Sequence, residues 1–123
     1  MKNLIVLCFA AFLSQAAFAQ TTGMVKKTAA TAAIAQTAQF QVWGNCGMCK
    51  KTIEKAAKSV TGVETAEWNV ETHQFSVAFN SAKTSVDKVH QAIAAAGYDT
   101  DLVKGNDAAY NKLHGCCQYE RRQ

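Results

Sequence analysis

The sequence contains no proline among its 123 residues. A site that depends on a cis-proline peptide bond is therefore excluded, because cis peptide bonds are almost confined to proline. The chain also lacks a run of about 20 apolar residues, the length that a membrane-spanning helix needs. Its formal net charge is only +4 and its basic residues are scattered, which argues against a nucleic-acid partner. The length leaves room for one small domain with accessory segments.

Residues 1–19 have the pattern of a secretory signal peptide. Lys2 supplies a positive charge, residues 4–13 are apolar, and residues 17–19 form a small-x-small cleavage site. The apolar run is too short for a membrane anchor, and a lipoprotein attached through Cys8 is less favoured because the residue before it is bulky. We therefore expect a periplasmic or secreted protein that has no membrane span after cleavage.

Three further segments are predicted after the signal peptide. Residues 20–38 are rich in Ala and Thr and show no sustained amphipathic pattern, which is typical of a linker. Residues 39–104 have regular apolar periodicity and are predicted to form the folded domain. Residues 105–123 form a tail that contains Cys116 and Cys117, with Asn106 as a candidate helix cap.

Strands and helices alternate within residues 39–104. Apolar residues at every second position predict strands, and apolar residues three or four apart predict helices. In chain order we expect a strand over 39–43, a helix beginning at Cys49, strands over 63–70 and 74–79, a helix capped by Thr84 and closed by Gly97, and a short strand over 100–103. This order predicts an α+β, ferredoxin-like βαββαβ sandwich with two helices on one face of a four-stranded antiparallel sheet.

The main chemical signal is the Cys46-x-x-Cys49 pair between the first strand and the first helix. A thiol pair at this spacing can bind a soft metal ion, exchange disulfides or form a structural disulfide. Backbone N–H groups at the helix N-terminus, together with Lys50 and Lys51, favour the thiolate form that metal binding and redox chemistry both need. The strand-to-helix context favours the metal site.

These residues resemble a known family. Cys46-Gly47-Met48-Cys49 between a strand and a helix, Gly97-Tyr98 before the last strand, and the βαββαβ order are similar to heavy-metal-associated domains of copper chaperones and periplasmic mercury scavengers. The similarity covers about residues 39–103. It implies that Cys46 and Cys49 are the metal ligands and that Tyr98 neighbours the metal loop.

The residues before the first cysteine depart from the family pattern. Family members usually carry Gly-Met-Thr or Gly-Met-His there, whereas this chain has Trp43-Gly44-Asn45. The methionine that supports the loop from below is therefore missing, and Trp43 or Met48 is the candidate replacement. Met48 and Asn45 are expected to lie near the metal loop.

Two thiolates from one short loop suit Cu(I), which they bind almost linearly while leaving room for a partner's thiolate. Hg(II) fits the same description, whereas Zn(II) favours four ligands and would recruit others. We therefore expect a metallochaperone or scavenger that acts by thiolate exchange and has no catalytic residues. A metal-transporting ATPase or efflux component is the hypothetical metal donor or acceptor.

Two other functions use the same cysteines. A periplasmic thiol-disulfide protein is the main alternative, although thioredoxin-like active sites also contain a cis-proline, which this chain lacks. The second alternative is an interaction domain in which Cys46 and Cys49 form a structural disulfide.

Adjacent Cys116 and Cys117 are the second chemical signal. They can form a separate thiolate pair, complete a four-sulfur site with Cys46 and Cys49, or form disulfides. The sequence does not choose among these, and a second soft-metal site is our working hypothesis.

Overall fold

The computed structural model describes residues 35–123, so the predicted signal peptide and most of the predicted linker lie outside the described residues. The elements are β1 (Ala35–Gln41), α1 (Gly47–Lys58), β2 (Val63–Trp68), β3 (Gln74–Asn80), α2 (Val86–Ala95), α3 (Asp107–Asn111) and the 3-10 turn η2 (Gly115–Cys117). Within this part of the chain, no helix combines the length and apolar character needed to cross a membrane.

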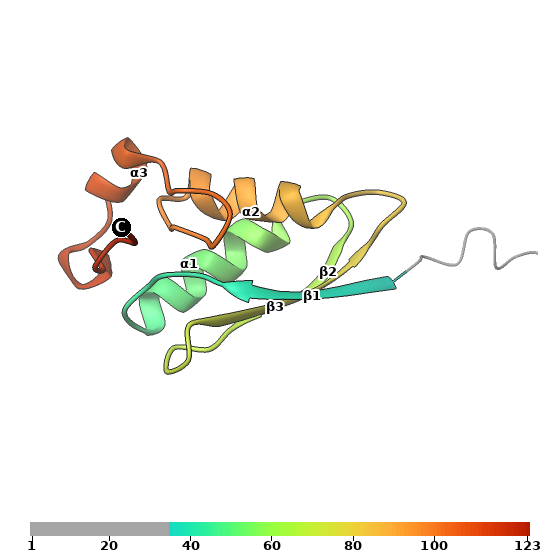
Figure 1. Ribbon diagram of the computed structural model, residues 1–123, viewed down its shortest axis with the longest axis horizontal. Coiled ribbons are helices and arrows are strands. Elements are labelled where there is room, and N and C mark those ends of the chain that lie inside the picture. Colours follow the sequence, from blue (N-terminus) through green and yellow to red (C-terminus); the bar gives the residue numbers. More distant parts are fainter. Residues whose placement is uncertain (1–34) are drawn as a thin grey trace, which may run out of the picture. The chain divides into compact units, whose positions relative to one another are not determined.

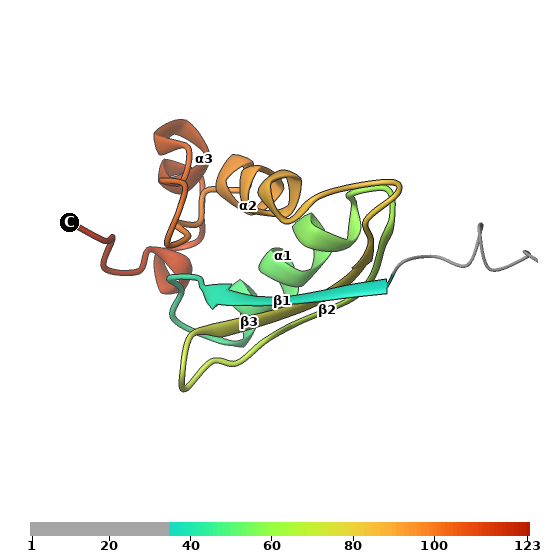
Figure 2. The ribbon, with the colours of Figure 1, turned by 45° about the vertical axis from the view of Figure 1, so that its right-hand side comes forward.

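The three strands form one antiparallel sheet in the order β1-β3-β2. The central strand is β3, in which Phe75 pairs with Phe40 of β1 on one side and with Trp68 of β2 on the other. The two longer helices, α1 and α2, lie over the same face of this sheet (Figures 1 and 2). The predicted layering of helices on one face of an antiparallel sheet is therefore confirmed.

The core fills the space between the sheet and these two helices. Alternate residues of β3 point into it, because successive side chains of a strand face opposite sides. Phe75, Val77 and Phe79 are all at most 3% exposed, as the sequence pattern predicted. The helices add residues spaced three or four apart, namely Cys49, Ile53 and Ala57 from α1 and Val89, Ile93 and Ala94 from α2.

Several element boundaries differ from the prediction, including the ends of the three strands, which lie at Gln41, Trp68 and Asn80. Strand β1 begins at Ala35 rather than residue 39, because Ala35 still pairs with Asn80 at the far end of β3. Helix α1 begins at Gly47, two residues before Cys49. Helix α2 is preceded by Ser85, and not by Thr84, as its N-cap residue.

The predicted fourth strand over residues 100–103 is reduced to a single bridge between Val42 and Thr100. Thr100 reverses the chain at this point. Its N–H donates to the carbonyl of Val103 at 2.8 Å, and its hydroxyl accepts from the N–H of Val103 at 3.0 Å. The described residues therefore form a three-stranded sheet, and a four-stranded one is not confirmed.

The chain beyond this turn is tied back to the domain by the buried carboxylate of Asp99, which is 0% exposed. The carboxylate accepts from the Gly105 N–H at 2.7 Å, from Arg121 Nη2 at 2.7 Å and from the Arg122 N–H at 3.1 Å. Ionised hydrogen bonds of this kind are stronger than neutral ones. One carboxylate therefore fixes both the beginning and the far part of the tail.

Tyr119 provides a second attachment for the tail. Its hydroxyl donates to the Gly97 carbonyl at 2.8 Å and accepts from the Asp99 N–H at 2.7 Å. Its ring stacks on Tyr98 with the centroids 5.6 Å apart, and its own carbonyl accepts from the Tyr110 hydroxyl at 2.7 Å. Because Tyr119 is only 2% exposed, this part of the tail belongs to the core.

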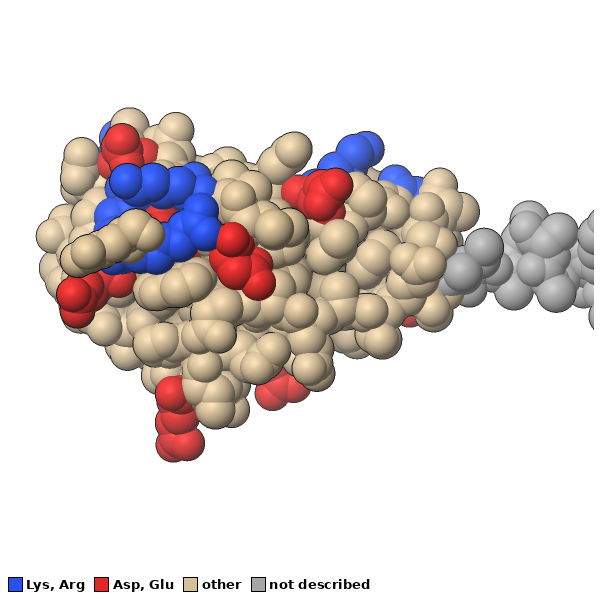
Figure 3. All heavy atoms as spheres, in the orientation of Figure 1, with Lys and Arg blue, Asp and Glu red and all other residues tan. Residues whose placement is uncertain are grey.

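Charged groups of both signs meet where the tail covers the domain. Arg121 contacts the carboxylate of Asp107 as well as Asp99, and Arg122 Nη1 donates to the Asp101 carbonyl at 2.6 Å. Figure 3 shows a cluster of basic side chains at one end of this face with acidic side chains around it, while other basic side chains lie toward the opposite end. The arginine side chains of the tail therefore help to attach the tail to the domain.

Replacing Asp99 tests this attachment. We expect Asp99→Asn to lower the free energy of unfolding by about 3 kcal/mol at neutral pH, because Arg121 loses its buried counter-charge. Burial would raise the pKa of Asp99, but hydrogen bonds from Arg121 and Gly105 outweigh it and hold that pKa below its ordinary value. The difference in unfolding free energy between wild type and variant should be fully present above the unfolded-state pKa of Asp99, about 3.9. It should shrink as the pH falls through the lower pKa of Asp99 in the folded protein.

Denaturant unfolding of both proteins at neutral pH and at about pH 3 measures this difference. Asp107→Asn is the matched control, since its side chain is 80% exposed and also contacts Arg121. The control should cost less than about 1 kcal/mol. An equal loss of unfolding free energy in the two variants would contradict the conclusion that Asp99 attaches the tail.

Candidate metal centre

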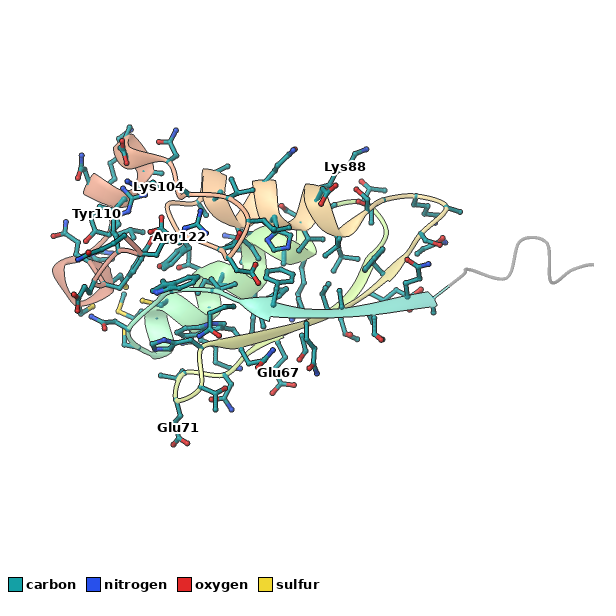
Figure 4. All side chains as sticks on the ribbon, in the orientation of Figure 1. Glu67, Glu71, Lys88, Lys104, Tyr110 and Arg122 are labelled. Carbon is teal, nitrogen blue, oxygen red and sulfur yellow. The ribbon has the colours of Figure 1, made fainter. Side chains whose placement is uncertain are left out.

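The turn from β1 into α1 brings the two predicted ligands together. Cys46 is the N-cap residue of α1 with extended backbone, and Cys49 lies in the first helical turn, where it is 0% exposed. Their Sγ atoms are 3.7 Å apart. The Asn45 N–H donates to Cys49 Sγ at 3.4 Å, so Asn45 lies beside the pair. Figure 4 shows sulfur atoms, in yellow, gathered beside the start of α1.

The helix N-terminus favours the thiolate form of Cys46. The backbone N–H of Cys49 is the main cause, and that of Met48 adds to it against the opposing effect of burial, so that the pKa of Cys46 falls to about 7. Unpaired N–H groups at the first turn of a helix carry partial positive charge, which stabilises an anion there. The predicted activation of this thiol by the helix is therefore consistent with the geometry.

Lys50 does not act as predicted. Its ammonium group is held by the Glu54 carboxylate at 2.7 Å and by the Trp68 carbonyl at 2.7 Å. The lysine charge thus joins α1 to β2, and the lowered pKa of Cys46 comes from backbone N–H groups.

The indole of Trp68 lies under the metal loop. A Cβ atom on Gly44 would stand 2.8 Å from Trp68 Cη2 and 3.3 Å from Cys49 Cβ. Trp68 is 0% exposed, and its Nε1 donates to the Val42 carbonyl at 3.0 Å. Met48, a candidate for this supporting role, is 47% exposed and does not fill the space.

The sequence pattern missed this role of Trp68, because it predicts only that Trp68 faces the core from a strand. Its contact with Gly44 joins residues that are far apart along the chain. The missing side chain at Gly44 was the one available signal, since a glycine leaves space for a large neighbour. Trp43, the other candidate, is half-buried and packs against the core.

Tyr98 lies near the cysteines and is 0% exposed. Burial raises the pKa of Tyr98, and the neighbouring Cys49 and then Cys117 raise it further. The hydroxyl therefore remains protonated and can donate to a sulfur atom.

The tail places Cys116 and Cys117 against the Cys46–Cys49 pair. Cys117 Sγ is 4.0 Å from Cys46 Sγ, and Cys116 Sγ is 3.9 Å from Cys117 Sγ and 3.7 Å from Met48 Sδ. The sulfur atoms of Cys46, Cys116 and Cys117 all lie within 4.8 Å of one another. The two cysteine pairs of the sequence thus form one cluster.

The cysteines of this cluster are free thiols with different surroundings. Cys49 and Cys117 are buried, Cys46 is half-buried and Cys116 is exposed. Burial, followed by the proximity of Cys49, raises the pKa of Cys117 to about 12. Sulfur ligands select soft ions such as Cu(I), and the arrangement therefore suits a soft metal.

Alkylation tests the electrostatics of the metal-free site. Because thiolates react and thiols do not, Cys46 should be alkylated by iodoacetamide with a pH midpoint near 7, well below that of a free cysteine peptide. Cys117 should stay unreactive through the neutral range. Peptide mapping by mass spectrometry measures both alkylation rates in the reduced protein. A Cys46 midpoint at or above that of the free peptide would contradict the lowered pKa of Cys46.

Substitution of Gly44 tests the support under the loop. Gly44→Ala places a methyl group against the Trp68 ring, and we expect about 1–3 kcal/mol of lost stability together with weaker Cu(I) binding. Gly47→Ala is the matched control, because no atom lies within 4 Å of the added Cβ. Thermal unfolding and Cu(I) competition measure both effects, and similar behaviour of the two variants would rule out Trp68 as the support.

Comparisons with known proteins agree with this geometry. A sequence model of the heavy-metal-associated domain matches residues 45–99, which include Cys46, Cys49 and Tyr98 and end before the tail cysteines. The copper chaperone CopZ of Staphylococcus aureus (strain bovine RF122 / ET3-1) is 40% identical over 55 residues, which are 45% of this chain and 81% of the chaperone. The periplasmic component of the mercuric transport protein of Pseudomonas aeruginosa is 41% identical over 71 residues, 57% of this chain and 78% of that protein.

A solved structure shows the same relationship. The N-terminal domain of a potential copper-translocating P-type ATPase from Bacillus subtilis, determined in the Cu(I)-loaded state, has a TM-score of 0.53 and 28% identity. The match covers 60% of this chain and 94% of that domain. With its strand-to-helix cysteine pair, its helices on one face of the sheet and these relatives, the chain belongs to the heavy-metal-associated domain family.

Proposed function

We propose that this protein is an exported metallochaperone or scavenger of soft metal ions, with Cu(I) favoured, that holds its cargo through Cys46 and Cys49. The observation that carries the proposal is the pair of sulfur atoms 3.7 Å apart at the start of α1. The names of the relatives, a copper chaperone and a mercuric transport component, support a soft metal as the cargo.

The two cysteines have different parts in binding. Within this pair, Cys46 is half-buried and has the lowered pKa, so its thiolate is the first of the two to bind an ion. Cys49 is buried and becomes the second ligand when its thiol releases a proton. In transfer, a partner's thiolate forms a bond to the ion as one of these two bonds breaks, and the released thiolate can take up a proton again.

Export and the partner are inferred from the sequence pattern and from two relatives. The pattern of residues 1–19 predicts export, and the mercuric transport relative is described as periplasmic. The ATPase domain from Bacillus subtilis has a similar fold, which supports a metal-transporting ATPase or another efflux component as the donor or acceptor. Hg(II) and Zn(II) are the other candidate ions.

A periplasmic thiol-disulfide protein is the second candidate, because a low-pKa thiol 3.7 Å from another thiol can also exchange disulfides. The two functions give opposite results in an insulin-reduction assay. The metallochaperone should not reduce insulin catalytically, and it should lose metal binding when Cys46 and Cys49 are oxidised to a disulfide.

Replacement of the pair tests the proposed function. Cys46→Ser/Cys49→Ser should weaken Cu(I) binding at least 100-fold, because the two thiolates that begin the site are removed. Competition with a chromogenic Cu(I) chelator under reducing conditions measures the affinity. Thr52→Ser is the control, since its hydroxyl donates to the Met48 carbonyl and is preserved in serine. Wild-type affinity in the double variant would disprove the proposed function.

A further inference from the structure

The tail cysteines lie at separations that a single metal ion can bridge. With metal–sulfur bonds of about 2.3 Å, the sulfur atoms of a trigonal site stand about 4.0 Å apart, and those of a linear pair stand about 4.6 Å apart. Cys46 and Cys117 are separated by 4.0 Å, and Cys116 and Cys117 by 3.9 Å. Two sides of the trio therefore have trigonal spacing, and the third, between Cys46 and Cys116, is within 4.8 Å. The Cys46–Cys49 pair at 3.7 Å must open to bind an ion linearly.

We propose that Cys116 and Cys117 bind the metal together with Cys46 as a three-thiolate site, so that Cys46 is shared between this trio and the Cys46–Cys49 pair. The inference rests on the proposed function, since it concerns the same cargo. It goes beyond that function because the residues matched to the family end at 99 and the ligands come from the tail.

The tail is held in place for this role. Cys117 is 3% exposed, and two residues further on Tyr119 is fixed by its bonds to Gly97 and Asp99. Arg121 then completes the attachment through the Asp99 carboxylate. A ligand held this way has a high effective concentration at the site, because it loses little freedom on binding the ion.

Tyr98 lies beside the same cluster. Its hydroxyl is buried, and the neighbouring thiols of Cys49 and Cys117 raise its pKa. Because the hydroxyl stays protonated, it can donate a hydrogen bond to a thiolate sulfur of a loaded site.

Sharing of Cys46 gives the ion a path between two positions. Cys116 is the exposed sulfur and lies beside the thioether of Met48, so a soft ion meets the trio from the solvent side. An ion in the trio moves to the pair when Cys49 loses its proton and forms a bond to it while the bonds to Cys116 and Cys117 break. The two released thiolates can take up protons, and the ion stays bound to Cys46 throughout.

The tail also affects delivery. A partner's thiolate must compete with Cys116 and Cys117, which are already beside the ion. The chain should therefore hold its cargo more firmly than a domain with only the Cys46–Cys49 pair, and it should release the ion more slowly to a competing chelator.

The number of bound thiolates can be measured with Hg(II) as the probe. Mercury bound by three thiolates absorbs ultraviolet light at longer wavelength than mercury bound by two. The full chain is used with Cys8→Ser in every sample, which removes the fifth thiol. One equivalent of Hg(II) is added to wild type, Cys49→Ser, Cys116→Ser/Cys117→Ala, and the control Gln118→Ser, which alters an exposed tail residue next to Cys117.

We expect the three-thiolate band in wild type, in Cys49→Ser and in the control, and the two-thiolate band alone in the tail variant. Alanine keeps a small apolar group at the buried position 117, and circular dichroism checks that the variant is folded. Cu(I) affinity should fall at least tenfold in the tail variant. A two-thiolate spectrum in wild type, or the wild-type spectrum in the tail variant, would overturn the inference.

Failure of this inference is distinct from failure of the proposed function. If the tail variant matches wild type while Cys46→Ser/Cys49→Ser loses binding, only the role of the tail is disproved. Wild-type affinity in Cys46→Ser/Cys49→Ser would instead disprove the proposed function, whatever the spectrum of the tail variant.

Discussion

The carboxylate of Asp99 is the constraint on which the arrangement of the sulfur atoms depends. A fully buried charge must be paired, and this one is satisfied only by groups of the tail: the N–H groups of Gly105 and Arg122 and the guanidinium of Arg121. Docking of the tail therefore satisfies a charge that the domain buries. It also buries Cys117 and places the exposed Cys116 beside it.

The structure combines two ways of placing a thiol. Cys46 and Cys49 are placed by local geometry, since a strand-to-helix turn of a few residues fixes both, and the helix N-terminus sets the pKa of the first. Cys116 and Cys117 are placed by long-range contacts through Tyr119 and the Asp99 carboxylate. The first pair is shared with the family, and the second lies outside the residues that match it.

Features that depend on residues close together in the chain could be predicted from the sequence. The alternation of Phe75, Val77 and Phe79 gave the buried face of β3, and the cysteine spacing placed the pair at the helix start. A short fourth strand was predicted over residues 100–103, but the hydroxyl of Thr100 accepts from the Val103 N–H and the segment turns back on itself instead.

Contacts between distant residues could not be predicted in the same way. Asp99 and Arg121 are 22 positions apart, and nothing in a single sequence selects one arginine as the partner of one aspartate. The support of the metal loop by Trp68 is of the same kind, because the tryptophan and Gly44 come from different elements. The sequence left several possible roles open for Cys116 and Cys117. Their position beside Cys46 could be seen only in the folded structure.

The packing of Trp68 under Gly44 has an optical consequence. Trp68 is 0% exposed, so its indole fluoresces from an environment without water. Any change in how the loop rests on the indole changes that environment. The side chain that supports the loop is thus also an intrinsic optical reporter of the loop's packing.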